Sequence, residues 1–123
     1  LDWDFYVTTL TTQYQPRVRW RDAANDLQYV DSAGVHQTFA TGVDLRVEAT
    51  LFHVGKLVIN PVTGRYVRFV LNDSVYDLST FDMQAAAVGV APRAFLRPSL
   101  VGNAGINSTV YVDDVILTQN EPA

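Results

Sequence analysis

Three arginines occupy every second position of the segment Arg17-Val18-Arg19-Trp20-Arg21. Alternate side chains of a β-strand point to opposite faces of the sheet, so this spacing puts the three guanidinium groups on one face. Val18 and Trp20 then share the other face. Because a guanidinium group donates paired hydrogen bonds to carboxylates and hydroxyls, the arginines predict donors along a ligand groove. The alternative is a solvated strand face above a core that contains Trp20.

Tyr29 and His36 follow this segment closely and are secondary candidates for the same groove. A sugar ring packs its C–H groups on an aromatic face, while its hydroxyls bind polar side chains. We therefore expect Arg17, Arg19 and Arg21 to line one concave sheet face together with Tyr29 or His36. The alternative for Tyr29 is a half-buried position with its hydroxyl at the surface.

Carboxylates give weaker indications of an enzyme. Asp44, Arg46 and Glu48 would share one face of a strand, as a polar stripe along a groove or as a solvated face in which the arginine bridges two acids. Glycoside hydrolysis needs two carboxylates about 5 to 5.5 Å or about 6.5 to 9.5 Å apart, and no spacing here indicates such a pair. No residue is assigned a catalytic role.

Asp113 and Asp114 are adjacent in a segment with strand character. Neighbouring side chains of a strand point to opposite faces, so the two carboxylates cannot serve one ligand unless a bulge intervenes. One of them should lie on the buried side and need partners. Capping a turn or accepting backbone N–H hydrogen bonds would meet that need.

Composition and charge narrow the class of protein. The chain has 123 residues, of which 48% are hydrophobic and 18% charged, as expected for one globular domain over residues 1–118 with a polar tail at 119–123. It has no cysteine, which excludes disulfides and thiolate sites. The net charge of −4 argues against a nucleic-acid partner. No apolar run approaches the roughly 20 residues that cross a bilayer.

Since the chain begins with Leu1 and its only methionine is Met83, we expect a piece of a longer precursor.

Strand and turn signals cover most of the chain. The clearest is a predicted β-meander over 55–78, with turns at Pro61-Val-Thr-Gly64 and Asn72-Asp-Ser74. Further strands are predicted over 3–12, 17–21, 27–30, 35–40, 43–52, 95–101 and 110–118, and a helical turn within 81–90. Short strands with turn signals every 8 to 12 residues predict an antiparallel sandwich or barrel. The expected core includes Val58, Tyr66, Phe69, Leu71, Val112 and Val115.

Three stretches of this sequence resemble the concanavalin A-like lectin/glucanase superfamily: WDFYV, GKLVINPVTGRYVRFVLNDSVYDLS and STVYVDDVILTQNEP. The resemblance implies a two-sheet jelly roll in which the strand at 3–7 lies beside the strand at 110–118. It also implies glycan binding, and a structural calcium ion held by Asp2 or Asp4 together with Asp113 or Asp114. The paired-glutamate signature of the catalytic members is missing from this chain.

These observations lead to one interpretation of the fold and three of the function. The fold is expected to be all-β, an antiparallel two-sheet β-sandwich of jelly-roll type. The function is expected to be that of a non-catalytic carbohydrate-binding, lectin-like module in an extracytoplasmic or secreted location, of bacterial type. The alternatives are a structural or oligomerising domain without a small ligand, and a fragment of a glycoside hydrolase or polysaccharide lyase.

Overall fold

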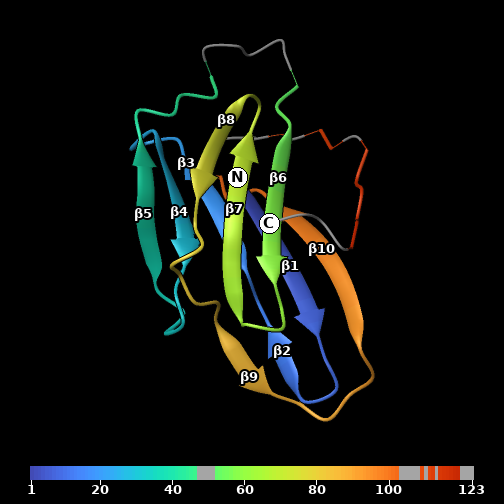
Figure 1. The fold of residues 1–123 in the computed structure, drawn as a ribbon. Coiled ribbons are helices and arrows are strands. Elements are labelled where there is room, and N and C mark those ends of the chain that lie inside the picture. Colours follow the sequence, from blue (N-terminus) through green and yellow to red (C-terminus); the bar gives the residue numbers. More distant parts are fainter. Residues whose placement is uncertain (47–51, 103–108, 110, 113, 120–123) are drawn as a thin grey trace.

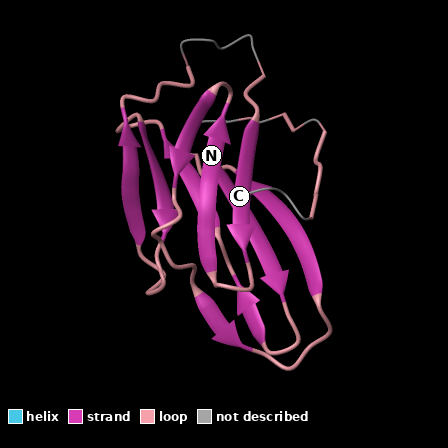
Figure 2. Cartoon of the chain, viewed as in Figure 1, coloured by secondary structure: helices cyan, strands magenta, loops and turns pink. Residues whose placement is uncertain are grey.

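The chain folds into two antiparallel β-sheets that pack against each other (Figures 1 and 2). The computed structural model describes residues 1–46, 52–102, 109, 111–112 and 114–119. Within these ranges all the regular structure is strand, so the all-β prediction is confirmed. The same residues contain no helix that could cross a membrane.

The larger sheet, sheet A, has seven strands: β1 (Asp2–Thr8), β2 (Thr12–Tyr14), β3 (Arg17–Arg21), β4 (Asp26–Val30), β5 (His36–Thr41), β9 (Ala85–Ala87) and β10 (Arg93–Ser99). β10 pairs with all seven residues of β1, while β3 and β2 pair with successive parts of its other edge. β4 and β5 extend the sheet beyond β3, and β9 extends it beyond β2. Sheet B is the meander of β6 (Gly55–Asn60), β7 (Arg65–Leu71) and β8 (Ser74–Asp77).

The meander is built as the sequence predicts. Gly64 ends the β6–β7 turn with a φ of 72°, and a Cβ atom there would lie 3.3 Å from the ring of Tyr14. Glycine therefore meets both a backbone and a packing requirement. Asn72 takes a φ of 52° in the next turn, and its side chain accepts a hydrogen bond from the backbone N–H of Val54.

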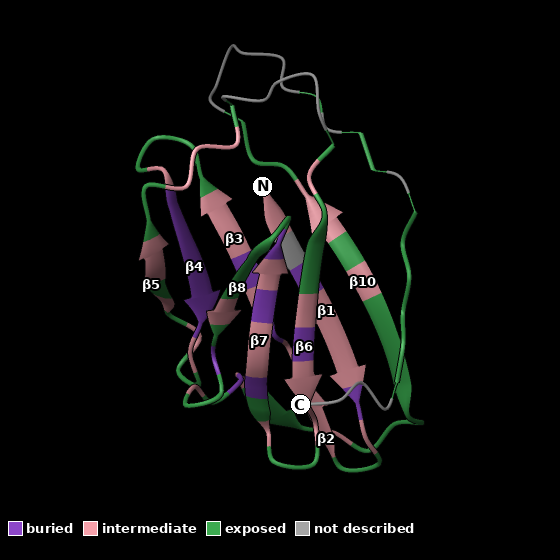
Figure 3. Cartoon of the chain, turned by 45° about the horizontal axis from the view of Figure 1, so that its top comes forward, coloured by how far each residue is buried: buried purple, intermediate pink, exposed green. Residues whose placement is uncertain are grey.

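The core lies between the two sheets (Figure 3). It gathers Val18, Leu27 and Tyr29 from sheet A, and Tyr66, Phe69, Leu71, Leu78 and Met83 from β7 and the chain after it. Tyr66 also joins the sheets by hydrogen bonds: its hydroxyl donates to the carbonyl of Val30 at 2.8 Å and accepts from the backbone N–H of Arg17 at 3.1 Å. Burial of the hydroxyl raises the pKa of Tyr66, so it stays protonated and can donate.

Four of the six predicted core residues are buried, namely Val58, Tyr66, Phe69 and Leu71. The prediction is wrong for Val112 and Val115, which are 52% and 56% exposed. Residues 111–112 and 114–118 form no strand, so the alternation of their sequence has no sheet on which to bury a face. The predicted pairing of the first strand with 110–118 is also wrong for these residues, because β10 takes one edge of β1 and β2 with β3 takes the other. Val110 lies outside the described residues.

Two local predictions need correction. The segment expected to hold a helical turn instead forms β9, since Ala85–Ala87 pairs with β2. An available strand edge outweighs the helix propensity of three alanines. The predicted strand over 43–52 is also wrong where described: Asp44 accepts hydrogen bonds from the backbone and side chain of Arg46, which makes a local turn. Glu48 lies outside the described residues.

Candidate ligand-binding face

The predicted alternation of the arginine segment is confirmed. Val18 is fully buried and Trp20 packs against the core, while Arg17, Arg19 and Arg21 lie on the face of sheet A that points away from sheet B. We call this surface the outer polar face. Besides the three arginines it includes the following residues, which the strand register or a hydrogen bond places on the same face: Asp2, Asp4, Tyr6, Gln15, Asp26, Gln28, His36, Thr38, Arg93, Phe95, Arg97 and Ser99.

Cross-strand partners fix each arginine of β3. Arg17 binds Asp4 of β1, which lies opposite it in the register of the sheet. Arg19 donates to Oε1 of Gln28 and Arg21 to Oδ1 of Asp26, both at 2.8 Å and both directly opposite on β4. The three side chains are therefore held by partners on neighbouring strands, although Arg21 stays exposed.

The acid of β4, Asp26, stays ionised under this cover. Asp26 is 4% exposed and accepts hydrogen bonds from Arg21 and from Thr38, the latter at 3.0 Å. The hydrogen bond from Arg21 is the main reason that the pKa of Asp26 lies below its usual value. Gln28 donates to Thr38 and completes the network. Every residue of β4 is consequently buried, on both faces of the strand (Figure 3).

A second polar cluster joins β1 and β10. Asp4 is 2% exposed, and its two carboxylate oxygens bind different arginines, Arg17 and Arg97, with Arg97 at 3.0 Å. Arg97 also donates to the hydroxyl of Tyr6 at 3.0 Å, and Gln15 donates to the same hydroxyl at 2.7 Å. One buried carboxylate thus positions two guanidinium groups.

An aromatic pair borders this cluster. The rings of Tyr6 and Phe95 stack with centroids 4.5 Å apart, and the guanidinium carbon of Arg97 lies 5.5 Å from the centre of the Tyr6 ring. Phe95 is 42% exposed and presents an aromatic surface beside the polar groups. The sequence interpretation missed Phe95 and Arg97, although their spacing of two residues on β10 is the same signal that identified the arginines of β3.

The structure separates the two secondary candidates. Tyr29 lies on the core face of β4, stacked on Phe81 at 4.2 Å and edge-on to Tyr66 at 5.6 Å, so it does not join the arginines. His36 does lie on the outer polar face, since it pairs with Val30 two residues from the pair of Gln28 with Thr38.

The surroundings of His36 disfavour its protonated form. Its Nε2 is buried without a hydrogen-bond partner among the described residues. Burial is the main cause that lowers the pKa of His36 below 6.5, and the nearby charges of Arg19 and Arg17 lower it further. Negative charges nearby raise the pKa of His36 without reversing its net decrease. They belong to Asp2, to Asp4 and to Asp31 on the neighbouring turn.

We predict that replacing His36 with glutamine reduces the acid sensitivity of the fold. The folded state binds a proton at His36 less tightly than the unfolded state does. Above about pH 6.5 His36 is neutral in both states and does not lower the free energy of unfolding. As the pH falls from there through the pKa of His36 in the folded state, proton binding favours the unfolded state and lowers the free energy of unfolding. Urea unfolding between about pH 8 and pH 5 should show a smaller loss for His36→Gln than for the wild type and the control His53→Gln. An NMR titration midpoint of His36 at or above 6.5 would contradict the prediction.

The residues expected to hold calcium are only partly brought together. Asp2 and Asp4 lie two residues apart on β1, but both oxygens of Asp4 bind arginines, while Asp2 accepts a 3.5 Å hydrogen bond from Ser99. Asp114 is exposed, with a φ of 28°, and Asp113 lies outside the described residues. Within the described ranges, no three metal-ligating side chains gather at one place. Calcium binding through Asp4 would require its arginine partners to leave.

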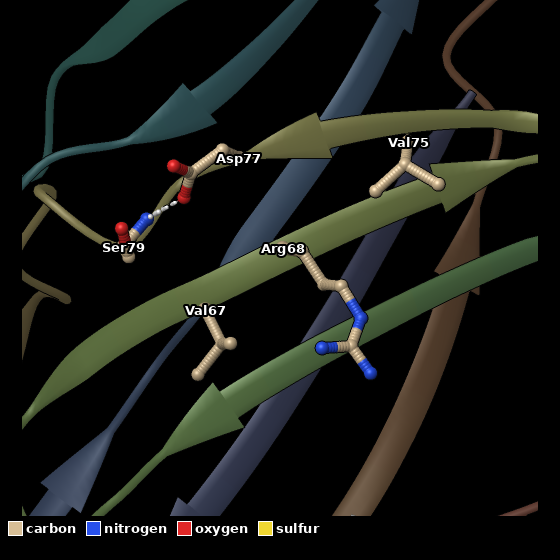
Figure 4. Close-up of a pocket in the computed structure, with 5 residues that line it drawn as sticks. All are labelled: Val67, Arg68, Val75, Asp77 and Ser79. Carbon is tan, nitrogen blue, oxygen red and sulfur yellow. Dashed lines mark hydrogen bonds between the residues drawn. The ribbon is translucent and has the colours of Figure 1, made fainter. Parts of the chain in front are cut away.

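A depression on the outer side of sheet B is a weaker candidate. It has a volume of about 320 Å³ and is lined by Val67, Arg68, Val75, Asp77 and Ser79 (Figure 4). Asp77 accepts a hydrogen bond of 2.9 Å from the backbone N–H of Ser79, which is the main cause that lowers the pKa of Asp77. With one arginine, one serine and one acid already bonded locally, this depression offers fewer positioned polar groups than the outer polar face.

Comparison of the chain with protein-family models, with curated proteins and with solved structures found no match. The resemblance to the concanavalin A-like superfamily therefore stays a prediction.

Proposed function

We propose that this chain is a non-catalytic carbohydrate-binding module, a β-sandwich of jelly-roll type that binds a glycan on its outer polar face. The observation that carries the proposal is the exposed ring of Phe95 beside fixed hydrogen-bonding groups on the same face. Ligand sites combine apolar or aromatic surface with a few placed polar groups. A pyranose presents C–H groups to such a ring and hydroxyls to the groups around it. An extracytoplasmic location would suit this function.

The rigidity of the face supports the proposal. Its side chains come from strands, and cross-strand hydrogen bonds hold those of Arg17, Arg19 and Arg97 before any ligand arrives. Groups that are already ordered lose less conformational entropy on binding, so more of the contact energy contributes to affinity. An array that spans several strands in this way suits a saccharide chain that lies across them.

The state of the carboxylates favours binding over hydrolysis. A glycosidase needs one carboxyl group that is protonated near neutral pH to act as the general acid. Asp4 and Asp26 both accept hydrogen bonds from arginines, and the pKa of Asp26 is lowered. These two acids are therefore suited to holding donors in place.

Replacing Phe95 with alanine should weaken glycan binding about tenfold or more, which corresponds to about 1.4 kcal/mol. A glycan-array screen of the wild type would identify the ligand, and titration calorimetry would then compare the variants. Phe52→Ala is the matched control, because Phe52 is 73% exposed and lies in the segment before β6, outside the outer polar face. Absence of any array signal, or equal affinity of Phe95→Ala and wild type, would refute the proposal.

A structural or oligomerising domain is the second candidate function, and one observation favours it. Tyr111, Ile116 and Leu117 are 80%, 77% and 61% exposed within one short segment. Exposed apolar side chains that cluster commonly mark a protein interface. Light scattering over a range of concentrations discriminates the candidates, because self-association together with an empty glycan array would favour the oligomerising domain.

A further inference from the structure

We propose that the glycan is acidic and that Arg93 and Arg97, on either side of Phe95, bind its carboxylates. This inference rests on the proposed carbohydrate-binding function and specifies its ligand class. The three residues lie at alternate positions of β10, so their side chains share the outer polar face. Arg93 and Arg97 are about 13 Å apart along an extended strand, with the aromatic ring between them.

The local charge around Phe95 is positive although the chain as a whole is acidic. Asp4 is the one carboxylate that Arg17 and Arg97 share, and the pair therefore leaves one positive charge in excess. Arg93 pairs in register with Thr8 and has no carboxylate partner among the described residues. The chain carries a net charge of −4, so this patch attracts anions that the protein as a whole would repel.

The geometry of Arg97 favours a carboxylate over a hydroxyl. Its Nη2 makes the hydrogen bonds to Asp4 and to the Tyr6 hydroxyl, which orients the planar guanidinium group. A guanidinium group has five N–H donors, and Arg97 is exposed, so donors remain for a ligand. A carboxylate can accept two parallel hydrogen bonds from such a group, whereas a single hydroxyl cannot.

Aromatic and cationic groups then have separate roles. The C–H face of a uronic acid ring would pack on Phe95, and the carboxylate at the edge of that ring or of its neighbour would reach Arg93 or Arg97. With one arginine on each side of the Phe95 ring, the site suits a saccharide chain that carries carboxylates on more than one of its sugar units. An oligosaccharide of uronic acids should therefore bind better than a single sugar.

The test compares polygalacturonate with its carboxyl-reduced form, which keeps the sugar chain and loses the charge. The wild type should bind polygalacturonate at least tenfold more tightly than the reduced polymer. Arg93→Gln should lose about tenfold in affinity for polygalacturonate, because a charged donor is removed. Arg65→Gln is the control: Arg65 is an exposed arginine of β7 that pairs with Asp82, away from the outer polar face.

Arg93→Gln is preferred to a change at Arg97, because Arg97 also binds the buried Asp4 and its loss could disturb the fold. Equal affinity for the two polymers, or binding of neutral glycans alone, would overturn the acidic-ligand inference and leave the carbohydrate-binding proposal standing. Equally tight binding of dextran sulfate would show attraction of any polyanion and would also overturn it. A failure of every glycan to bind would instead refute the carbohydrate-binding function itself.

Discussion

Replacing Tyr66 with alanine should lower the free energy of unfolding by about 3–5 kcal/mol, the usual cost of deleting a large buried ring. Tyr66 is 1% exposed and lies at the centre of the core, with the ring of Tyr29 edge-on at 5.6 Å. The truncation would remove both this packing and the hydrogen bonds that link β7 to β3 and β4. Urea unfolding monitored by fluorescence would measure the change.

The variant Tyr66→Phe separates the hydroxyl from the ring. It should cost about 1–3 kcal/mol, since the buried carbonyl of Val30 and the N–H of Arg17 both lose a partner. Tyr111→Ala and Tyr111→Phe are the controls, because Tyr111 is 80% exposed and surface changes commonly stay within about 0.5 kcal/mol. If the Tyr66 variants were no less stable than these controls, the core would not depend on this residue.

This bond network connects the core to the candidate site. The backbone N–H that Tyr66 binds belongs to Arg17, whose side chain holds Asp4 on the opposite face of sheet A. Sheet B thus helps to fix the position of β3 from the core side, and with it the positions of the three arginines of β3. Loss of the Tyr66 hydroxyl should consequently loosen the outer polar face as well as the core.

Local sequence patterns predict much of this fold. The alternation at 17–21 predicts that the arginines share one face and that Val18 enters the core, and residues adjacent in sequence predict the meander and its glycine turn. The turn at 31–34 between β4 and β5 is equally local, since Asp31 accepts hydrogen bonds from the backbone N–H groups of Ala33 and Val35. Each of these features is decided by neighbouring residues, which is why the sequence alone reveals them.

Contacts between strands far apart in the sequence are the part of the fold that local patterns do not predict. Asp4 and Arg97 are 93 residues apart, and only the register of β1 with β10 brings them together. Register depends on the fit of whole strands, so no local motif predicts the contact between Asp4 and Arg97. The error at Tyr29 differs in kind, because Tyr29 alternates with Gln28 and shares its face with Leu27. The alternation along β4 therefore predicts the face on which Tyr29 lies better than its closeness in sequence to the arginines does.

Asp4 is the residue on which the outer polar face most depends, and Asp4→Asn should destabilise the protein by about 2–4 kcal/mol. Removing one partner of a buried ion pair commonly costs about 3–5 kcal/mol, because the remaining charge loses its compensation. Here solvent screens part of that charge, since the Arg97 side chain is 58% exposed, whereas Arg17 is only 25% exposed. An asparagine would also turn N–H donors toward two guanidinium groups that can only donate.

Asp2→Asn is the matched control, because it makes the same change two residues away, where the one side-chain hydrogen bond to the carboxylate among the described residues is a long one from Ser99. Its cost should stay below about 1 kcal/mol. In a double-mutant cycle, Asp4→Asn combined with Arg97→Gln should cost less than the sum of the single changes, since the second change removes a charge that the first left uncompensated. Additive effects, or equal costs for the changes at Asp4 and Asp2, would mean that Asp4 does not hold the arginines in place. Arg97 would then have no fixed position beside Phe95, and the geometric preference for a carboxylate would lose its basis.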